Sequence, residues 1–276
     1  MRREWMIQHD GAGRPTVYPL EEPDWSSPIC LLLHGYNVEP EGALRAYDRL
    51  FATLRSVAIL PPILSSRSWR VYWPGYASGG LAAGKTFTSP LTYASQIPSA
   101  REAAVALREY IDRKASGRAQ ITMIAHSLGC RVVLELLDSY AQHPSQSAPD
   151  FPLVVLMAAA VPVYFFEELS RLWRGALLPR ETLVLFSARD KILAGPFRLG
   201  QTVAGEGVFP KAVGATGRPP GGFWRRVVST GNDHSDYFDD RETATEIARS
   251  LGQATARVLR GTFRQTLTLA VRELPK

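Results

Sequence analysis

The stretch AHSLG, at residues 125 to 129, carries the clearest chemical signal in this sequence. The apolar run ITMI ends directly before it, and CRVVLELL, which is compatible with a helix, follows. A serine at a sharp strand-to-helix turn presents its hydroxyl at the edge of a sheet, where it can attack a carbonyl carbon. Small neighbours allow strand and helix to approach, and Ala125 and Gly129 are small. The pattern predicts Ser127 as a nucleophile, with a simple helix N-cap as the alternative.

A serine hydroxyl attacks when a base accepts its proton and an acid orients that base. In proteins built around such a turn, the acid and then the histidine follow the serine along the chain. The apolar run TLVLFS ends in ARD, which places Asp190 after a strand, and GNDHSDYF places His234 in a later loop. The carboxyl ends of parallel strands share one edge of a sheet. We therefore expect Ser127, His234 and Asp190 to meet there as a catalytic triad.

Acyl transfer also needs N–H donors for the negative oxygen of the tetrahedral intermediate. The apolar run ICLLL ends in the loop HGYN, so the backbone N–H of Tyr36 is one predicted donor. The N–H of Leu128, directly after the serine, is the second. His34, Gly35 and Asn37 are predicted to support this loop, and we expect His34 to brace it by hydrogen bonds.

The other histidines and acids have plainer interpretations. His126 adjoins the serine, but neighbours in a tight turn point apart, so it is predicted to shape the pocket with Gly129 and not to act as the base. His9 and His143 are expected at the surface. Four carboxylates near His234 are alternatives to Asp190 and are expected to serve mostly as loop and helix-cap residues: Asp233, Asp236, Asp239 and Asp240.

The elements that position these residues alternate between strand and helix. Strands are predicted at 29–33, 69–73, 120–125, 153–160, 182–187 and 224–229, with one or two edge strands in residues 1–28. Helices are predicted at 42–55, 98–114, 128–141, 164–178 and 240–260, whereas 75–96 and 196–222 are expected to be loops. This alternation indicates one α/β domain over residues 1–276, with a mostly parallel sheet of about eight strands and helices on both faces.

Four segments together resemble the α/β-hydrolase superfamily, and within it a bacterial lipase-like branch: LLLHGYN, AHSLGCRVVLELL, LFSARDKIL and DHSDYF. The resemblance covers roughly residues 29 to 260. It implies Ser127 as nucleophile, His234 as base and Asp190 as acid, acting on an ester. Ala125 replaces the usual glycine, and HGYN replaces the lipase loop HGGG, which argues against esters of tertiary alcohols. Two alternatives remain, a non-catalytic binding protein of this fold and a nucleotide hydrolase.

The nucleotide hydrolase rests on GGLAAGKT, residues Gly79–Thr86, which matches the phosphate-binding loop pattern. That loop needs a strand directly before it and a helix at its Lys-Thr. PGYAS precedes it instead, and Pro90 would interrupt such a helix. The glycines are expected to permit an active-site loop.

Two apolar stretches lie outside the predicted triad. Residues 161–180 contain YFFEELSRLWRGALLP, which is either a packing helix or a short lid over a lipophilic acyl pocket. The C-terminal VLRGTFRQTLTLAVREL mixes arginine with apolar residues and suggests either a packed helix or peripheral membrane contact.

Composition excludes several other classes. The 276 residues carry a formal charge of +6 with scattered arginines, which gives no reason to expect nucleic-acid binding. Cys30 and Cys130 both lie in apolar runs and are predicted to be buried thiols. The N-terminus lacks an apolar signal segment and no run suits a membrane span, so a cytoplasmic protein is expected. The predicted chemistry needs no metal or organic cofactor, its partner is a small ester, and oligomeric state is not predicted.

Overall fold

The apolar runs of the sequence become the strands of one sheet. In a computed structural model, residues 3–36, 38–74, 90–115, 119–145, 147–217, 224 and 226–272 are described. Eight strands in these ranges form a sheet in the order β2-β1-β4-β3-β5-β6-β7-β8. The strands are β1 (Glu4–His9), β2 (Pro15–Pro19), β3 (Ile29–Leu33), β4 (Ser68–Tyr72), β5 (Ile121–His126), β6 (Val154–Met157), β7 (Thr182–Phe186) and β8 (Arg226–Ser229). Neighbours run parallel except β1 and β2 at one edge, which confirms the predicted sheet.

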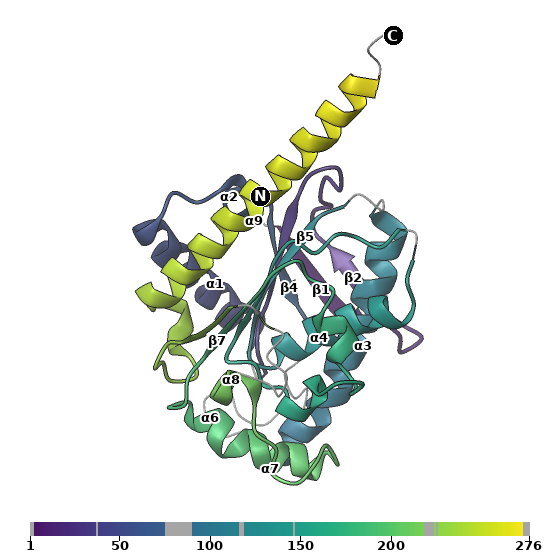
Figure 1. Cartoon of the computed structure of the whole chain (residues 1–276). Coiled ribbons are helices and arrows are strands. Elements are labelled where there is room, and N and C mark those ends of the chain that lie inside the picture. The colour runs from purple at the N-terminus through teal and green to yellow at the C-terminus, as the bar shows by residue number, and fades with distance from the viewer. Residues whose placement is uncertain are drawn as a thin grey trace.

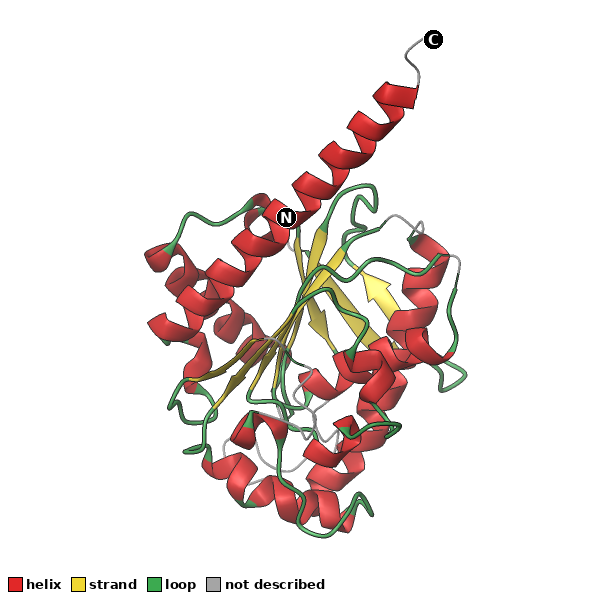
Figure 2. Ribbon diagram, in the orientation of Figure 1, coloured by secondary structure: helices red, strands yellow, loops and turns green. Residues whose placement is uncertain are grey.

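Helices cover both faces of this sheet (Figures 1 and 2). The α-helices are α1 (Pro40–Val57), α2 (Pro62–Ser65), α3 (Pro90–Lys114), α4 (Gly129–Gln142), α5 (Trp173–Ala176), α6 (Lys191–Ala194), α7 (Pro196–Val203), α8 (Val213–Thr216) and α9 (Arg241–Arg272). Two short 3₁₀ helices are η1 (Val163–Phe166) and η2 (Asp236–Phe238). Helices α1 and α9 pack together on one face, and α3 and α4 pack together on the other.

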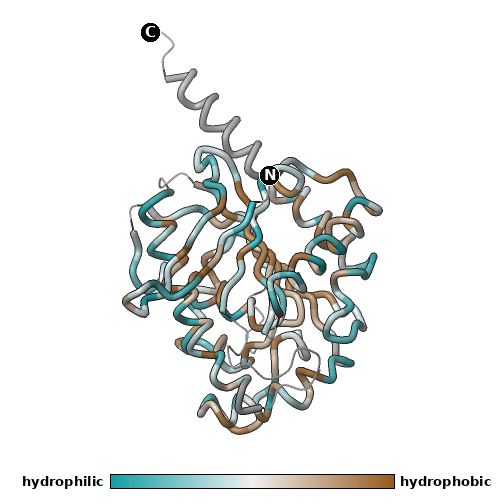
Figure 3. Tube along the Cα trace, turned by 180° about the vertical axis from the view of Figure 1, so that it is seen from behind, coloured by the Kyte–Doolittle hydropathy of each residue, from teal (hydrophilic) through white to brown (hydrophobic). Residues whose placement is uncertain are grey.

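The central strands are buried on both faces, as parallel strands beneath helices must be. Every residue of β3, β5 and β6 is buried. Hydrophobic stretches gather in these strands when the chain is coloured by hydropathy (Figure 3). Cys30 and Cys130 are buried free thiols within this core, as predicted. Burial of this apolar surface stabilises the sheet, and the parallel direction of its central strands brings their carboxyl ends to one edge.

Four sequence predictions were wrong, in whole or in part. Residues 164–178 do not form one helix: η1 and α5 are separated by a stretch in which Leu169 has a φ of 65°, outside helical space. Residues 196–222 are not all loop, because α7 and α8 lie within them. Helix α3 begins at Pro90, before the predicted start, and carries Pro98 in its interior. In the N-terminal region, β1 is an inner strand and only β2 lies at the edge.

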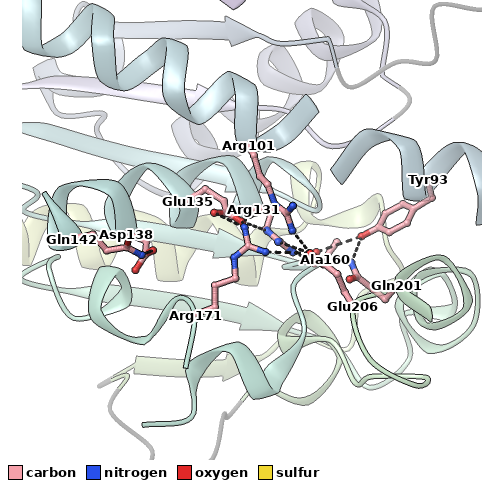
Figure 4. Close-up of polar contacts among 10 residues, drawn as sticks. All are labelled: Tyr93, Arg101, Arg131, Glu135, Asp138, Gln142, Ala160, Arg171, Gln201 and Glu206. Carbon is pink, nitrogen blue, oxygen red and sulfur yellow. Dashed lines mark hydrogen bonds and ion pairs between the residues drawn. The ribbon is translucent and has the colours of Figure 1, made fainter. Parts of the chain in front are cut away.

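A buried ion-pair network connects the segment after η1 to the helix that follows Ser127 (Figure 4). Arg131 of α4 is fully buried and holds the carboxylate of Glu206 with two hydrogen bonds of 2.9 Å. Its Nε donates to Glu135 at 2.6 Å. Arg171, from the segment before α5, bonds Glu135 at 2.8 Å, and Arg101 of α3 pairs with Glu206. The Glu206 carboxylate pairs with arginines from α3, α4 and the segment before α5, so the network holds these elements against one another.

Helix α9 closes the chain and extends beyond the body of the protein (Figure 1). Ile247 and Leu251 are buried near its beginning, as the sequence pattern predicted. Among the residues that the structure describes, none of the helices combines the length and the apolar character needed to cross a bilayer.

Candidate active site

Ser127 lies in the sharp turn between β5 and α4. Its φ of 53° is in the left-handed region, which is uncommon for a residue with a side chain. The Ser127 N–H donates to the carbonyl of Met157 at 2.9 Å, and its own carbonyl accepts from the Ala160 N–H at 3.2 Å. The end of β6 therefore holds this strained backbone from both sides. Strain of this kind persists where surrounding contacts determine the geometry, and it is common at active sites.

Glycine is required next to this turn for a steric reason. A Cβ added at Gly129 would lie 2.3 Å from the carbonyl oxygen of His34 and 2.9 Å from that of Leu33. No real Cβ sits so close to backbone oxygen, so α4 can begin directly against the end of β3 only with glycine there. The predicted need for a small residue at position 129 is confirmed.

Ser127, His234 and Asp190 meet at the carboxyl edge of the sheet. The Ser127 Oγ lies 2.9 Å from His234 Nε2, and His234 Nδ1 lies 2.7 Å from Asp190 Oδ2. A carboxylate only accepts hydrogen bonds, so Nδ1 carries the ring proton of neutral His234 and Nε2 is free to accept from the serine hydroxyl. The structure therefore brings together the three residues that the sequence predicted, in the tautomer that a base requires.

Asp190 is held by a second contact. It is the N-cap residue of α6, and its Oδ1 accepts from the Leu193 N–H at 3.0 Å. The residue is fully buried, whereas the His234 side chain is 15% exposed. Each carboxylate oxygen thus has one defined donor, so the carboxylate cannot rotate freely and the imidazole is fixed from behind.

The competing carboxylates near His234 are engaged elsewhere. Asp233 lies 3.8 Å from Lys191, and Asp236 accepts from the Asp233 N–H. Asp239 bonds Arg49 at 2.6 Å. Asp240 accepts from the Thr243 N–H at 2.7 Å, which is the N-cap contact expected at the start of α9. The structure places all four in loop and cap roles.

The loop after β3 lies directly against the serine. A Cβ added at Gly35 would lie 2.9 Å from Ser127 Cβ, so this loop crosses the turn at the closest distance that glycine allows. Tyr36 follows it, and Leu128 precedes the first residue of α4, where the first N–H groups of a helix have no intrahelical acceptor. The two predicted oxyanion donors thus flank Ser127 in the chain segments that meet here. Asn37 lies outside the described residues.

His34 braces this loop, as predicted. Its Nδ1 lies 2.8 Å from the Gly35 carbonyl, to which it must donate, and its Nε2 accepts from the Trp73 N–H at 3.3 Å. Burial lowers the pKa of His34 to about 4, so the ring is neutral at physiological pH and can serve both contacts. Trp73 returns a bond from its indole Nε1 to the His34 carbonyl at 2.9 Å and stacks on the ring.

His126 contacts the loop that carries His234 rather than the Ser127 hydroxyl. Its Nε2 lies 2.7 Å from the carbonyl oxygen of His234. Burial, followed by the proximity of His234, lowers the pKa of His126 to about 3. The prediction that His126 is not the base therefore agrees with the direction in which its side chain points. His9 is partly exposed beside Glu102, and His143 is exposed.

Sequence reasoning missed a series of aromatic contacts that begins at Tyr36, the residue after Gly35. Tyr36 meets Tyr93 edge-to-face with ring centroids 5.6 Å apart, and Tyr93 meets Phe197 in the same way at 6.0 Å. The Tyr93 hydroxyl is 3.5 Å from the carbonyl of Ala160, the residue whose N–H holds Ser127. A Cβ at Gly200 would lie 2.4 Å from the Tyr93 ring, so α7 leaves space for it.

The signal for these residues was weak. Tyr93 stood at the end of a stretch rich in Gly and Ser that was predicted to be a loop. Trp73 directly follows β4, the neighbour of β3. A large residue at that strand end could have indicated a contact with the loop after β3. Gly79–Thr86, the nucleotide-loop pattern, lies outside the described residues. Within the described ranges, no group of three or more His, Cys, Asp or Glu side chains is arranged to hold a metal ion.

Comparison with known proteins places the chain among hydrolases. The family described as "Alpha/beta hydrolase of unknown function (DUF900)" matches residues 22–208. A search of curated proteins found no match. Solved structures with similarity include an esterase from Pyrobaculum calidifontis, at 16% identity and a TM-score of 0.46 over 92% of this chain and 85% of that one.

Two further solved structures are similar over most of their length. The esterase domain of a Rhodothermus marinus protein is 14% identical, with a TM-score of 0.44, and the match covers 93% of this chain and 99% of that one. YbtT, a type II thioesterase from the yersiniabactin NRPS/PKS biosynthetic pathway, is 13% identical, with a TM-score of 0.44 over 86% and 98%.

Proposed function

We propose that this chain, which belongs to the family of α/β hydrolases of unknown function matched over residues 22–208, is a serine hydrolase that cleaves carboxylic esters. The observation that carries the proposal is the relay from Ser127 Oγ to His234 Nε2 at 2.9 Å and from His234 Nδ1 to Asp190 at 2.7 Å. These contacts support the proposal, because acyl transfer needs a nucleophile, a base within hydrogen-bond reach of it and an acid that orients the base.

In the first half of the reaction, the Ser127 hydroxyl attacks the ester carbonyl and His234 Nε2 takes its proton. Asp190 stabilises the imidazolium that forms, because the buried carboxylate faces Nδ1. The carbonyl oxygen becomes an oxyanion beside the N–H groups of Tyr36 and Leu128. Each such donor contributes on the order of 10²-fold or more to the rate. The imidazolium then returns its proton to the leaving alcohol, and an acyl-enzyme remains.

In the second half, a water molecule takes the place of the alcohol. His234 removes a proton from that water as it attacks the acyl carbonyl, and the second tetrahedral intermediate uses the same N–H donors. Collapse of this intermediate releases the carboxylic acid and returns the proton to the Ser127 oxygen. His234 therefore acts twice, and its position matters after the serine has been acylated.

The acyl group is proposed to be lipophilic. The ring of Tyr36, which is partly exposed next to the loop that lies against Ser127, packs edge-to-face on buried Tyr93, and Tyr93 packs in the same way on buried Phe197. An apolar wall of this kind favours an acyl chain over a polar substituent, because burying apolar surface is favourable and burying a polar group without a partner is not.

A fluorophosphonate probe tests the chemistry directly. The probe forms a covalent bond between its phosphorus and an activated serine oxygen, with loss of fluoride. We expect labelling of the folded wild-type protein and none of the Ser127→Ala variant, with circular dichroism to show that both are folded. If the folded wild-type protein is not labelled, the fold serves binding and the proposal is wrong.

A series of p-nitrophenyl esters with acyl chains of increasing length then measures the acyl preference. We expect kcat/KM to rise from acetate to a chain of intermediate length, because each methylene buried adds about 0.8 kcal/mol of favourable transfer energy. A kcat/KM that falls steadily from acetate upward would contradict a lipophilic acyl pocket while leaving the serine mechanism intact.

A further inference from the structure

His126 joins the turn that carries the nucleophile to the loop that carries the base. Its Nε2 is 2.7 Å from the carbonyl oxygen of His234, more than a hundred residues away in sequence. A carbonyl oxygen can only accept, so the ring proton of His126 must be on Nε2. Because burial keeps the ring neutral at physiological pH, this single proton is committed to the His234 main chain.

The surroundings of His126 leave its ring little freedom. The side chain is buried, with 6% of the residue exposed. Its ring packs against Phe238 at 4.8 Å and Tyr237 at 6.1 Å between centroids, both from the segment after the base loop. On another side its Nδ1 faces Gly35, where an added Cβ would be 3.1 Å away. His126, at the end of β5 beside the serine turn, thus touches two other segments of the site: the loop after β3 and the loop that carries His234.

This contact has a consequence for the second half of the proposed reaction. Before acylation, the Ser127 hydroxyl is itself a donor to His234 Nε2 and helps to place the ring. Once the Ser127 oxygen carries an acyl group, it has no proton to donate and that bond is lost. The bond from His126 to the His234 carbonyl does not involve the serine oxygen, so it persists.

We infer that His126 is a positioning residue that holds the base loop in place when the serine is acylated, and that it therefore supports deacylation more than acylation. This inference rests on the proposed function. Asp190 holds the His234 ring at Nδ1, and His126 holds the His234 main chain, so the two contacts fix different parts of one residue. His126 acts through His234 and does not touch the substrate.

Three substitutions separate the hydrogen bond from the volume of the ring. His126→Phe keeps an aromatic ring but removes the donor. His126→Gln places an amide nitrogen near the former Nε2, because both nitrogens are three bonds beyond Cβ. His126→Asn is the matched control: it has the same amide, but its nitrogen reaches only as far as Nδ1. Each variant is checked for folding by circular dichroism before its kinetics are measured.

The readout is the pre-steady-state burst of p-nitrophenol from p-nitrophenyl acetate, which separates acylation from deacylation. For His126→Phe and His126→Asn we expect deacylation to slow by about tenfold, which is the loss of one well-formed hydrogen bond, with a smaller effect on the burst rate. Acyl-enzyme then accumulates and the burst becomes more pronounced. His126→Gln is expected to recover most of the lost deacylation rate.

Three results would overturn the inference. One is deacylation at the wild-type rate in a folded His126→Phe variant. Another is an equal slowing of acylation and deacylation. If His126→Phe does not fold, the comparison moves to His126→Gln and His126→Asn, and equal deacylation in those two overturns it. Failure of the proposed function is distinguishable, because it appears as the absence of fluorophosphonate labelling in the wild-type protein.

Discussion

At the scale of single residues, the site depends on hydrogen bonds from neighbouring main chain that hold Asp190 and Ser127 in place. Asp190 binds His234 with one oxygen and the Leu193 N–H with the other. Ser127 is held in a left-handed conformation by Met157 and Ala160. In both cases the main chain of a neighbouring segment sets the geometry. In the proposed reaction these groups are organised before substrate arrives, which is the condition under which electrostatic stabilisation is most effective.

The negative charge of Asp190 can be removed by substituting asparagine, which has nearly the same shape. In Asp190→Asn, the Leu193 N–H still finds the amide oxygen, so the amide N–H₂ faces His234 Nδ1 and forces the ring proton to Nε2. That tautomer cannot accept the serine proton, and we expect kcat on a p-nitrophenyl ester to fall by about 10⁴-fold. The matched control is Asp233→Asn, an exposed carboxylate 3.8 Å from Lys191, which should keep activity near wild type. Equal activity in the two variants would remove Asp190 from the mechanism.

The buried histidines predict how stability depends on pH. The pKa of His34 is lowered by burial to about 4 and that of His126 to about 3, whereas both titrate near their ordinary value in the unfolded chain. The unfolded state therefore binds more protons as the pH falls below about 6.5, and the free energy of unfolding decreases down to the folded pKa values. Each ring contributes a loss of about 2 kcal/mol between about pH 7 and about pH 5.

Urea denaturation at those two pH values measures this loss. In His34→Gln we expect the difference between the two free energies of unfolding to shrink by about 2 kcal/mol. The matched control is His143→Gln, at an exposed position, which should leave the difference unchanged. An unchanged difference in His34→Gln would mean that this ring is accessible to protons in the folded protein.

At the scale of elements, the start of α4 is a tightly constrained junction. Helix α4 begins so close to the end of β3 that no side chain fits at Gly129. By contrast, Gly252 lies in α9, and a Cβ added there would meet nothing within 4 Å. Glycine is therefore required at position 129 for a steric reason, whereas the structure shows no steric requirement for glycine at position 252.

Alanine at each glycine tests this difference. Gly129→Ala is expected to lower the free energy of unfolding by about 3 kcal/mol, because the backbone oxygens of Leu33 and His34 cannot easily move away. Gly252→Ala is expected to raise it by about 0.5 to 1 kcal/mol, the ordinary gain of alanine over glycine within a helix. Urea denaturation measures both, and a Gly129→Ala protein as stable as wild type would mean that the turn relaxes.

At the scale of the whole molecule, buried charge connects the layers. Fully buried Arg131 lies at the centre of a network with Glu206, Glu135, Arg101 and Arg171 (Figure 4). The network ties together α3, α4, the segment before α5 and the turn after α7. The same region contains residues 161–180, whose role as a lid stays a prediction. Phe166 and Leu172 are buried there, so much of this segment packs into the core.

A double-mutant cycle measures how strongly the network couples. Glu206→Gln leaves the buried Arg131 without its bidentate partner and is expected to cost about 3 to 5 kcal/mol of unfolding free energy. Arg131→Met with Glu206→Gln should cost clearly less than the sum of the single changes, because no unpaired charge remains buried. Strictly additive costs would show that solvent reaches the pair and that it does not connect the layers.

Local patterns were sufficient for part of this architecture. Burial on both faces of a parallel sheet produces continuous apolar runs, and a tight turn demands small residues, so the central strands and the serine turn were predicted correctly. The order of serine, acid and histidine along the chain follows from the order of the strands. The strands and the turn depend on neighbours in sequence, and the order of the three residues can be read along the chain, so these features can be recognised without coordinates.

Long-range contacts settled the remainder. His234 meets Ser127 across 107 positions and Asp190 across 44. The sequence favoured Asp190, and the packing places that carboxylate against His234, whereas the four alternatives have other partners. Helix α7 is short and lies in a stretch rich in Gly and Pro, and it packs where Gly200 makes room for the Tyr93 ring. The hydrogen bond from His126 to the base loop, and the braces from Trp73 to His34, join segments whose separation along the chain gives no pattern to detect.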